Sequence, residues 1–399
     1  MSKVTIPFSA TSLDAWRAQL LKELKENTAL LQYNSSIEDI SFSLLENEAP
    51  QLKFKESSAF SWKRMVAADA AKAKQSNEFL LTALMQGADA IFIEHTTTDT
   101  NWSVLLNEIE TAYISCLLLF ETPTAYSHFI ETAPKNQIAH CIALHHYGAQ
   151  QNFISTFDIQ QIGANCSTEL ATGLLQMHQQ LELNSKDTTL YFEMGVGKEY
   201  LVEIAKFRAL QMLLAQLEEI HEVRINLELI ARTGFCNKSL ADPYTNLLRL
   251  STEGLSAVMG GAAYVCLQPY DALSTDGASA FAQRMALNVG NLLNEEAQLS
   301  ELNDPLSGAY AIEQLSLALA KKSWSLLCQL DAEHATAQQK LKTEIDQTRA
   351  MRLESFKSGK DILIGINAFQ NEFESPKATW GTIPTALGFP YLIFEKSAN

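Results

Sequence analysis

The chain has 399 residues, of which 47% are hydrophobic and 19% are charged, so it can bury a large core. Its formal net charge of −16 argues against nucleic acid as a partner, because phosphate binding needs a cationic surface. No apolar run approaches the roughly 18 residues of a membrane span, and the first residues lack an apolar signal core, so we predict a cytoplasmic protein. The six cysteines form no CxxC pair, which predicts reduced core residues.

The N-terminal region is predicted to be an arm followed by a linker. Ser12 is a suitable cap for a first helix. The apolar face of this helix is formed by Trp16, Leu20, Leu21 and Leu24. Residues 31–60 are mixed and polar, so we assign residues 1–60 to the arm and linker.

Between residues 61 and 335, apolar runs that predict strands alternate with runs of helical periodicity. The predicted strands are residues 89–95, 113–120, 138–146, 152–157, 189–194, 223–231 and 264–268, with an ill-defined last strand near residues 299–304. The predicted helices are residues 69–86, 102–110, 125–131, 166–183, 199–220, 243–259, 278–294 and 312–331. Apolar strands with little alternation are typical of a parallel sheet. About eight such strands predict an α/β fold, a (β/α)8 TIM barrel with an N-terminal arm and a C-terminal extension.

Residues 336–399 are predicted to form the C-terminal extension. Residues 330–360 are charged and helical in pattern, and residues 361–366 are a further short apolar run. The segment that follows contains Pro376, Pro384 and Pro390 among several aromatic residues. This composition predicts an irregular tail that docks on the rest of the chain.

Two motifs at predicted strand ends are candidate sites. The turn at residues 195–198, Gly-Val-Gly-Lys, suggests a phosphate loop, but its spacing does not match a P-loop, which favours a tight βα turn. Glu94-His95 and His145-His146 also end strands, where the catalytic groups of a barrel lie. Adjacent side chains of a strand point to opposite faces, so the paired histidines are not expected to share a metal ion. We therefore predict no metal site.

The most specific pattern begins in a strand, loop and helix over residues 223–261. Its members are Asp242-Pro243-Tyr244, Asn246, Arg249, Glu253, Gly260-Gly261, Phe281, Arg284, Asn288, Glu295-Glu296 and the run DPLSGAY at residues 304–310. In this order, these residues resemble the signature of the methylmalonyl-CoA mutase family. A second similar block covers residues 191–209. The resemblance extends over residues 5–370, and it is weakest over residues 96–150.

The resemblance implies a barrel in which adenosylcobalamin and an acyl-CoA thioester meet at the barrel mouth. In this family a tyrosine presses on the cofactor and a histidine hydrogen-bonds the thioester carbonyl, whereas this sequence has Ala67 and Asp158 at those positions. Phe157 replaces a tyrosine, and Ile230 and Arg232 replace a histidine and a glutamine of the same pocket. An ionised aspartate cannot donate a hydrogen bond and repels developing negative charge. We therefore predict a degenerate site, without catalytic residues, at these five positions.

The resemblance also implies a division of labour between two subunits. The family's cobalamin module supplies a cobalt ligand from an Asp-x-His-x-x-Gly turn, and this sequence contains no Asp-x-His. We therefore expect a small subunit of a heterodimeric methylmalonyl-CoA mutase that is inactive alone and stabilises a catalytic large subunit. The partner would bind adenosylcobalamin, and no cofactor is expected on this chain. The N-terminal arm would embrace the partner, unless it packs on its own barrel instead.

Two other functions stay open. The chain could be a catalytic acyl-CoA mutase barrel that takes cobalamin from a separate subunit, although Asp158 argues against that function. It could also be a regulatory barrel that binds CoA thioesters without a mutase partner. The sequence further leaves open whether the cobalamin module was lost or belongs to a longer polypeptide.

Overall fold

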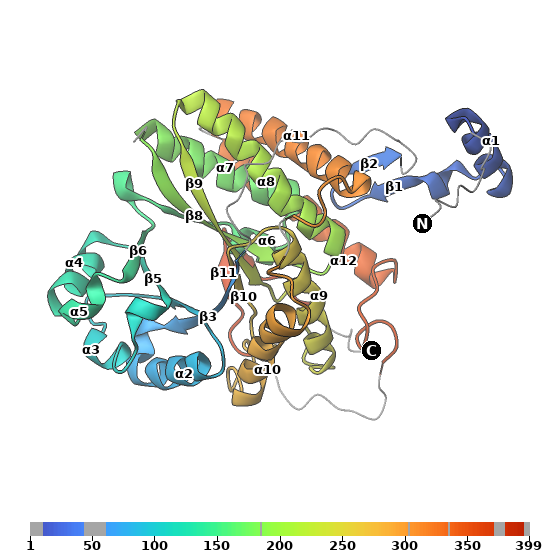
Figure 1. The fold of residues 1–399 in the computed structure, drawn as a ribbon. Helices are drawn as coiled ribbons and strands as arrows, with labels where there is room; N and C mark the ends of the chain where they lie inside the picture. The colour runs from blue at the N-terminus through green and yellow to red at the C-terminus, as the bar shows by residue number, and fades with distance from the viewer. Residues whose placement is uncertain are drawn as a thin grey trace, which may run out of the picture.

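The computed structural model describes residues 11–43, 61–183, 186–301, 304–333, 336–370 and 380–394. Eight parallel strands form one sheet in the order β6-β5-β4-β3-β10-β9-β8-β7. They are β3 (Lys63–Asp69), β4 (Ala90–Glu94), β5 (Ser115–Phe120), β6 (Cys141–His145), β7 (Phe153–Ser155), β8 (Thr188–Val196), β9 (Ile225–Thr233) and β10 (Tyr264–Cys266). Because β3 pairs with β10, the sheet curls into a (β/α)8 barrel (Figure 1), which confirms the predicted fold class.

Helices surround the sheet on its outer side, except for the short α6, which lies at one end of the barrel (Figure 1). They are α2 (Ala73–Met85), α3 (Trp102–Leu105), α4 (Pro123–Thr132), α5 (Lys135–Ile138), α6 (Phe157–Gln161), α7 (Cys166–Leu183), α8 (Tyr200–His221), α9 (Thr245–Met259) and α10 (Ala280–Asn291). Two further helices, α11 (Tyr310–Ala332) and α12 (Ala337–Lys357), form an additional layer, and α11 packs on α7 and α8. Among the described residues, no helix is long and apolar enough to cross a membrane.

The barrel is joined between β6 and β7 by one asparagine rather than by a strand ladder. The backbone N–H of Asn152 donates to the carbonyl of His145 at 3.1 Å. The side-chain oxygen of Asn152 accepts from the backbone N–H of His145 at 2.6 Å, and its amide group donates to the carbonyl of Ala143 at 3.0 Å. A side-chain amide therefore satisfies backbone groups that an unpaired strand edge would leave open.

Three features of the barrel differ from the sequence prediction. The expected last strand, residues 299–304, is not a strand, since residues 299–301 form a turn and a bend and residues 302–303 lie outside the described part. The strand that completes the set of eight is instead β3, the first barrel strand in the chain, which was not predicted. It begins with two cations, Lys63 and Arg64, so its short apolar part does not stand out as a run. The helix predicted over residues 102–110 ends earlier, at Leu105.

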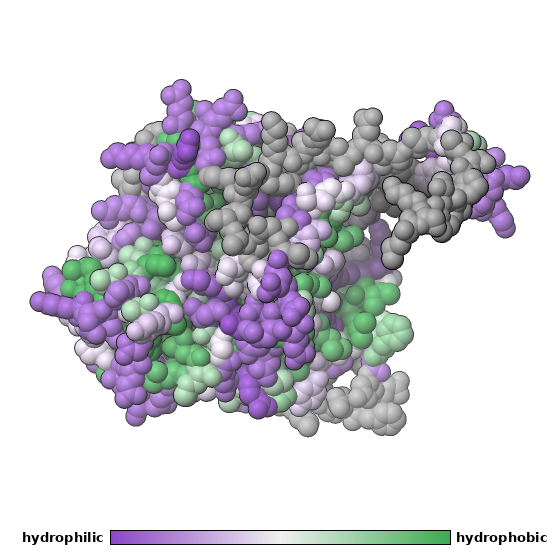
Figure 2. Space-filling model, viewed as in Figure 1, coloured by the Kyte–Doolittle hydropathy of each residue, from purple (hydrophilic) through white to green (hydrophobic). Residues whose placement is uncertain are grey.

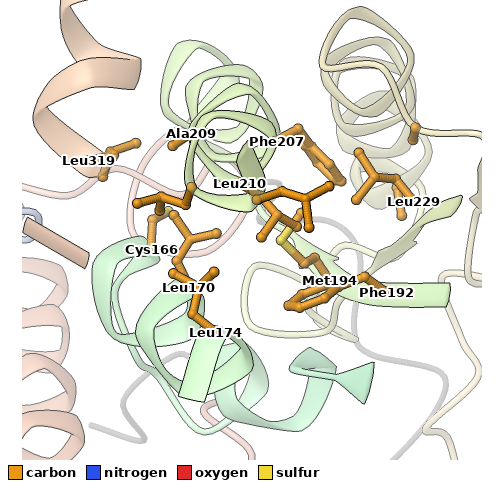
Figure 3. Close-up of a cluster of buried hydrophobic side chains, with 14 of the residues drawn as sticks. Cys166, Leu170, Leu174, Phe192, Met194, Phe207, Ala209, Leu210, Leu229 and Leu319 are labelled. Atoms are coloured by element: carbon orange, nitrogen blue, oxygen red, sulfur yellow. The ribbon is translucent and has the colours of Figure 1, made fainter. Parts of the chain in front are cut away.

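Side chains on the two faces of the strands build two separate cores. The barrel interior is filled by Met65, Ala90, Phe92, Leu117, Leu144, Phe153, Tyr191, Ile230, Tyr264 and Cys266. One part of the outer core lies between β8, α7 and α8, where Phe192 and Met194 face Leu170 and Leu210 (Figure 3), and another part lies between β4, β5 and the helices α2 to α4. Bulky side chains therefore occupy the barrel axis as a packed interior.

Gly173 in α7 provides a first test of this packing. A methyl group at Gly173 would overlap the ring of Phe192 and approach Cγ2 of Thr156 within 2.9 Å. We expect Gly173→Ala to lower the free energy of unfolding by about 1–3 kcal/mol, as overpacked cores do. Gly254→Ala in α9 is the matched control, because its new methyl group meets only leucine side chains at 3.0–3.5 Å. Denaturant titration of both variants measures the difference, and an equal stability of the two variants would contradict this packing.

Two segments extend beyond the barrel. The N-terminal arm comprises α1 (Leu13–Glu23) and the hairpin of β1 (Gln32–Ser35) and β2 (Ile40–Ser43), and α1 stands away from the barrel in Figure 1. Ser12 caps α1 as predicted, because its side chain accepts from the backbone N–H of Ala15. The C-terminal segment forms a second hairpin, β11 (Thr385–Ala386) and β12 (Phe389–Pro390), which returns to the barrel.

Candidate functional site

The candidate site is the barrel mouth, which we define by the interior-facing groups at the carboxyl ends of the strands. These groups are Ala67, Glu94, Ser155, Glu193, Arg232 and Cys266. Side chains alternate along a strand, so each of these residues lies two positions beyond an apolar residue of the interior cluster. The apolar filling of the barrel therefore gives way to charged groups at its mouth, where barrel enzymes carry their active sites.

Arg232 is the centre of the charged groups. Its two terminal nitrogens donate to the two carboxylate oxygens of Glu94, at 2.7 and 2.9 Å. One of them also reaches Glu193 at 3.4 Å, and the second oxygen of Glu193 accepts from the hydroxyl of Ser155 at 2.6 Å. In the amide orientation that satisfies both residues, Gln268 accepts from Arg232 at 2.9 Å. The donors of Arg232 are thus engaged by this protein's own side chains.

Burial and charge act in opposite directions on these groups. Burial alone would lower the pKa of Arg232, but Glu94 and Glu193 raise it well above its ordinary value. Burial raises the pKa of Glu193, while Arg232 pulls it down. The guanidinium is therefore a permanent cation, and its charge opposes the effect of burial on the pKa of Glu193.

Phe157 and Asp158, at the start of α6, complete the mouth. The ring of Phe157 lies under the guanidinium of Arg232, with 4.9 Å between the guanidinium carbon and the ring centroid. The hydroxyl of Tyr391 donates to a carboxylate oxygen of Asp158, and the Tyr391 ring meets the Phe157 ring edge-on at 6.4 Å. Burial and then Asp158 raise the pKa of Tyr391. Asp158 therefore accepts a hydrogen bond from a distant part of the same chain.

The five positions singled out in the sequence do not all lie in one place. Phe157, Asp158 and Arg232 are brought together at the mouth, through the ring contact and through Tyr391. Ile230 is fully buried below them in the interior cluster. Ala67 is half-buried at the β3 side of the mouth and, with Cys266, borders a cleft of about 280 Å³ that runs along β3 between α2 and α10.

The sequence did not identify the groups that partner these five positions. Glu94 was expected at the barrel mouth as a strand end, but not as the partner of Arg232, which is 138 residues away. Glu193, Gln268 and Tyr391 were not singled out. The alternation of Tyr191 and Glu193 along β8 could have indicated Glu193.

The other strand-end motifs have structural roles. The backbone N–H of Gly195 donates to Glu169 at 3.0 Å and its carbonyl accepts from Lys206 at 2.6 Å, so the turn after β8 is held from within. Lys198 of this turn pairs with Asp361. His145 is hydrogen-bonded to the hydroxyl of Tyr147 at 3.0 Å. Within the described ranges, no group of three histidine, cysteine or acidic side chains is placed to hold a metal ion.

Comparison with known proteins gives the family. The family model described as "Methylmalonyl-CoA mutase" matches residues 135–385. A methylmalonyl-CoA mutase of Cereibacter sphaeroides is 29% identical over 56% of this chain and 34% of its own length. The small subunit of Porphyromonas gingivalis methylmalonyl-CoA mutase is 30% identical over 45% of this chain and 30% of its own length. The large subunit of the Propionibacterium freudenreichii methylmalonyl-CoA mutase is 28% identical over 56% of this chain and 33% of its own length.

The chain thus spans about a third of the length of the curated relatives that it matches. The family model covers more than half of the residues, and it includes the mouth residues from Asp158 to Arg232 as well as α9. The sequence pattern, the barrel topology and the family match all agree. This chain belongs to the methylmalonyl-CoA mutase family.

Proposed function

We propose that this chain is a non-catalytic small subunit of a heterodimeric, adenosylcobalamin-dependent methylmalonyl-CoA mutase. Its role would be to stabilise a large subunit that interconverts methylmalonyl-CoA and succinyl-CoA. The names of two relatives support this proposal, because one is a small subunit and another is a large subunit of such an enzyme. The observation that carries the proposal is the closed network of charges at the barrel mouth.

This network is poorly suited to an acyl-CoA thioester. A thioester carbonyl that gains negative charge needs hydrogen-bond donors aimed at it. Arg232 directs its donors to Glu94 and to Glu193, and Asp158 is an acceptor. Three carboxyl groups and one guanidinium also make the mouth acidic, which disfavours a carboxylate-bearing acyl group.

The same residues do not fit adenosylcobalamin. A corrin ring needs an open, flat surface over the mouth, whereas Tyr391 lies edge-on against Phe157 at that place. We therefore propose that the partner subunit binds the cofactor.

Two exposed apolar surfaces support a partner. In the N-terminal arm, Trp16 of α1 is 44% exposed and Leu20 is only half-buried. Figure 2 shows apolar surface over α9 and the segment after α12. The exposed apolar side chains of that region are Tyr244, Leu248, Ile362 and Ile364, each at least 52% exposed. Exposed apolar surface of this kind is typical of protein–protein contacts.

The test is to mix the purified chain with a methylmalonyl-CoA mutase large subunit. We expect co-elution on size exclusion, and no turnover by this chain alone with adenosylcobalamin. Turnover by this chain when a separate cobalamin protein is added would instead establish a catalytic barrel. Failure to bind any mutase subunit, combined with binding of a CoA thioester, would favour a regulatory barrel.

Trp16 provides a sharper test of the arm. We expect Trp16→Ala to weaken binding of the large subunit by about 2 kcal/mol or more, as buried tryptophans at interfaces do. Arg17→Ala is the control, since Arg17 is also exposed on α1 but adds no apolar surface. Surface plasmon resonance of the two variants measures both affinities. Equal affinities would show that the arm packs elsewhere.

A further inference from the structure

One continuous segment crosses the barrel mouth from side to side. This segment, residues 380–394, is called the mouth strap below. At its start, Trp380 forms an antiparallel bridge with Ser274 in the loop after β10. At its end, the backbone N–H of Leu392 donates to the carbonyl of Gln161 in α6 at 2.7 Å. The hairpin β11–β12 lies between these two attachments, so the strap connects the β10 side of the mouth to the α6 side.

The hairpin of the strap has a sequence that suits a tight turn. Leu387 and Gly388 both have positive φ, at 52° and 89°. Such a two-residue turn matches the twist of a hairpin and favours glycine. The strap therefore has a local structure of its own, formed between neighbouring residues.

The strap is held by three buried side chains at its end and by four half-buried ones in its hairpin region, Ile383, Ala386, Leu387 and Phe389, which pack on the apolar cluster that contains Phe157. Residues 381–390 are half-buried or exposed, whereas Tyr391, Leu392 and Phe394 are buried. The ring of Phe394 packs on Phe356 of α12 at 4.7 Å between centroids. Tyr391 reaches furthest into the mouth, where its hydroxyl donates to Asp158.

Helix α12 ties the anchored end to α6. Arg349 donates to the carbonyl of Pro390 in the strap at 2.7 Å and to that of Ile162 at 3.0 Å. Arg352 donates to the carbonyls of Gly163 and Ala164. The residues that follow α6 and the strap are thus held by the same helix, and α6 itself carries Phe157 and Asp158.

We propose that the mouth strap is an intramolecular plug, which takes the place of a ligand at the barrel mouth and lifts as a local unit. In this arrangement Asp158 is a positioning residue for Tyr391. Local opening requires the buried end of the strap, Tyr391, Leu392 and Phe394, and its half-buried side chains to leave their contacts, while the strands of the barrel stay paired. This inference does not depend on a large subunit, since it concerns contacts within one chain.

Cys236 reports on the anchored end of the strap. It is partly buried beside Leu392 and Phe394, and its sulfur lies 3.2 Å from the carbonyl oxygen of Gln161. Tyr391→Phe removes the hydroxyl that bonds Asp158 and keeps the ring. We expect N-ethylmaleimide to alkylate Cys236 about tenfold faster in this variant, because hydrogen bonds to charged groups are among the stronger ones. Mass spectrometry gives the rate at each cysteine.

Three controls make this result specific. Tyr113→Phe removes a hydroxyl from a tyrosine that is 86% exposed, and it should leave the Cys236 rate unchanged. Cys328 is exposed and monitors the reagent, whereas Cys116 is buried within β5 and monitors unfolding of the barrel. The proposal is overturned if Tyr391→Phe leaves the Cys236 rate unchanged. It is also overturned if Cys116 reacts faster in step with Cys236, because the strap then opens only with the whole barrel.

Discussion

Replacing Arg232 with methionine is expected to destabilise the barrel by about 3–5 kcal/mol, because it leaves buried carboxylates without their cation. The side chains of Glu94 and Glu193 are 18% and 4% exposed, so water does not replace the lost partner. Denaturant titration at pH 7 gives the free energy of unfolding. Arg224→Met is the control, since Arg224 is exposed just before β9.

The pH dependence of this variant distinguishes the loss of the ion pair from the loss of side-chain packing. Without Arg232, the interaction that lowers the pKa of Glu193 is gone, so its native pKa rises further above that of the unfolded chain. Between the pKa of Glu193 in the unfolded chain and its higher pKa in the native state, the native state then binds more protons than the unfolded state. The free energy of unfolding therefore falls as pH rises from the first value to the second. We expect Arg232→Met to be less destabilised at pH 5 than at pH 8. A penalty that is the same at both pH values would contradict the ion-pair account.

The second large effect is expected at Lys206 in α8, which is fully buried. Lys206 contacts Glu169 at 2.8 Å and Glu203 at 2.7 Å, and it donates to the carbonyl of Gly195. Lys206→Met should cost about 3–5 kcal/mol, again because two carboxyl groups lose their cation. Lys74→Met on the exposed side of α2 is the matched control, and a similar stability of the two variants would refute the role of this network.

Glu169 in this network gives a pH signature in the unmodified protein. Burial raises its pKa to about 7, against the opposing effect of Lys206. Between the ordinary value of 4.5 and about 7, the native state holds a proton that the unfolded state releases. The contribution of Glu169 to stability therefore decreases as pH rises across this window. Glu169→Gln should remove that decrease, which a stability series from pH 4.5 to pH 7.5 would show.

Much of the fold follows from local patterns in the sequence. The apolar runs predicted at residues 113–120 and 223–231 contain the strands β5 and β9, which are largely buried because they lie between the barrel interior and the outer helices. The strand β3 shows the limit of such patterns. Its apolar part is short and alanine-rich, and its pairing with β10 is a contact between distant parts of the chain. Periodicity carries no information on such long-range pairing.

The candidate site shows a similar limit. Resemblance to a family singled out Asp158 and Arg232, because it compares residues at single positions. Their partners were not accessible in this way, since Tyr391 lies 233 residues from Asp158 in the chain. The composition of the C-terminal segment predicted a docking tail, but only the structure shows that its tyrosine enters the barrel mouth.

The most direct test is binding of a CoA thioester to the isolated chain. Isothermal titration with succinyl-CoA should show no saturable binding with a Kd below about 1 mM, a free energy of roughly −4 kcal/mol. At the barrel mouth, Arg232 donates to Glu94 and Glu193 and Tyr391 donates to Asp158, so neither group is free to bind the thioester carbonyl. Saturable micromolar binding of succinyl-CoA would contradict the account, because the donors of Arg232 would then have to leave Glu94 and Glu193 for the thioester.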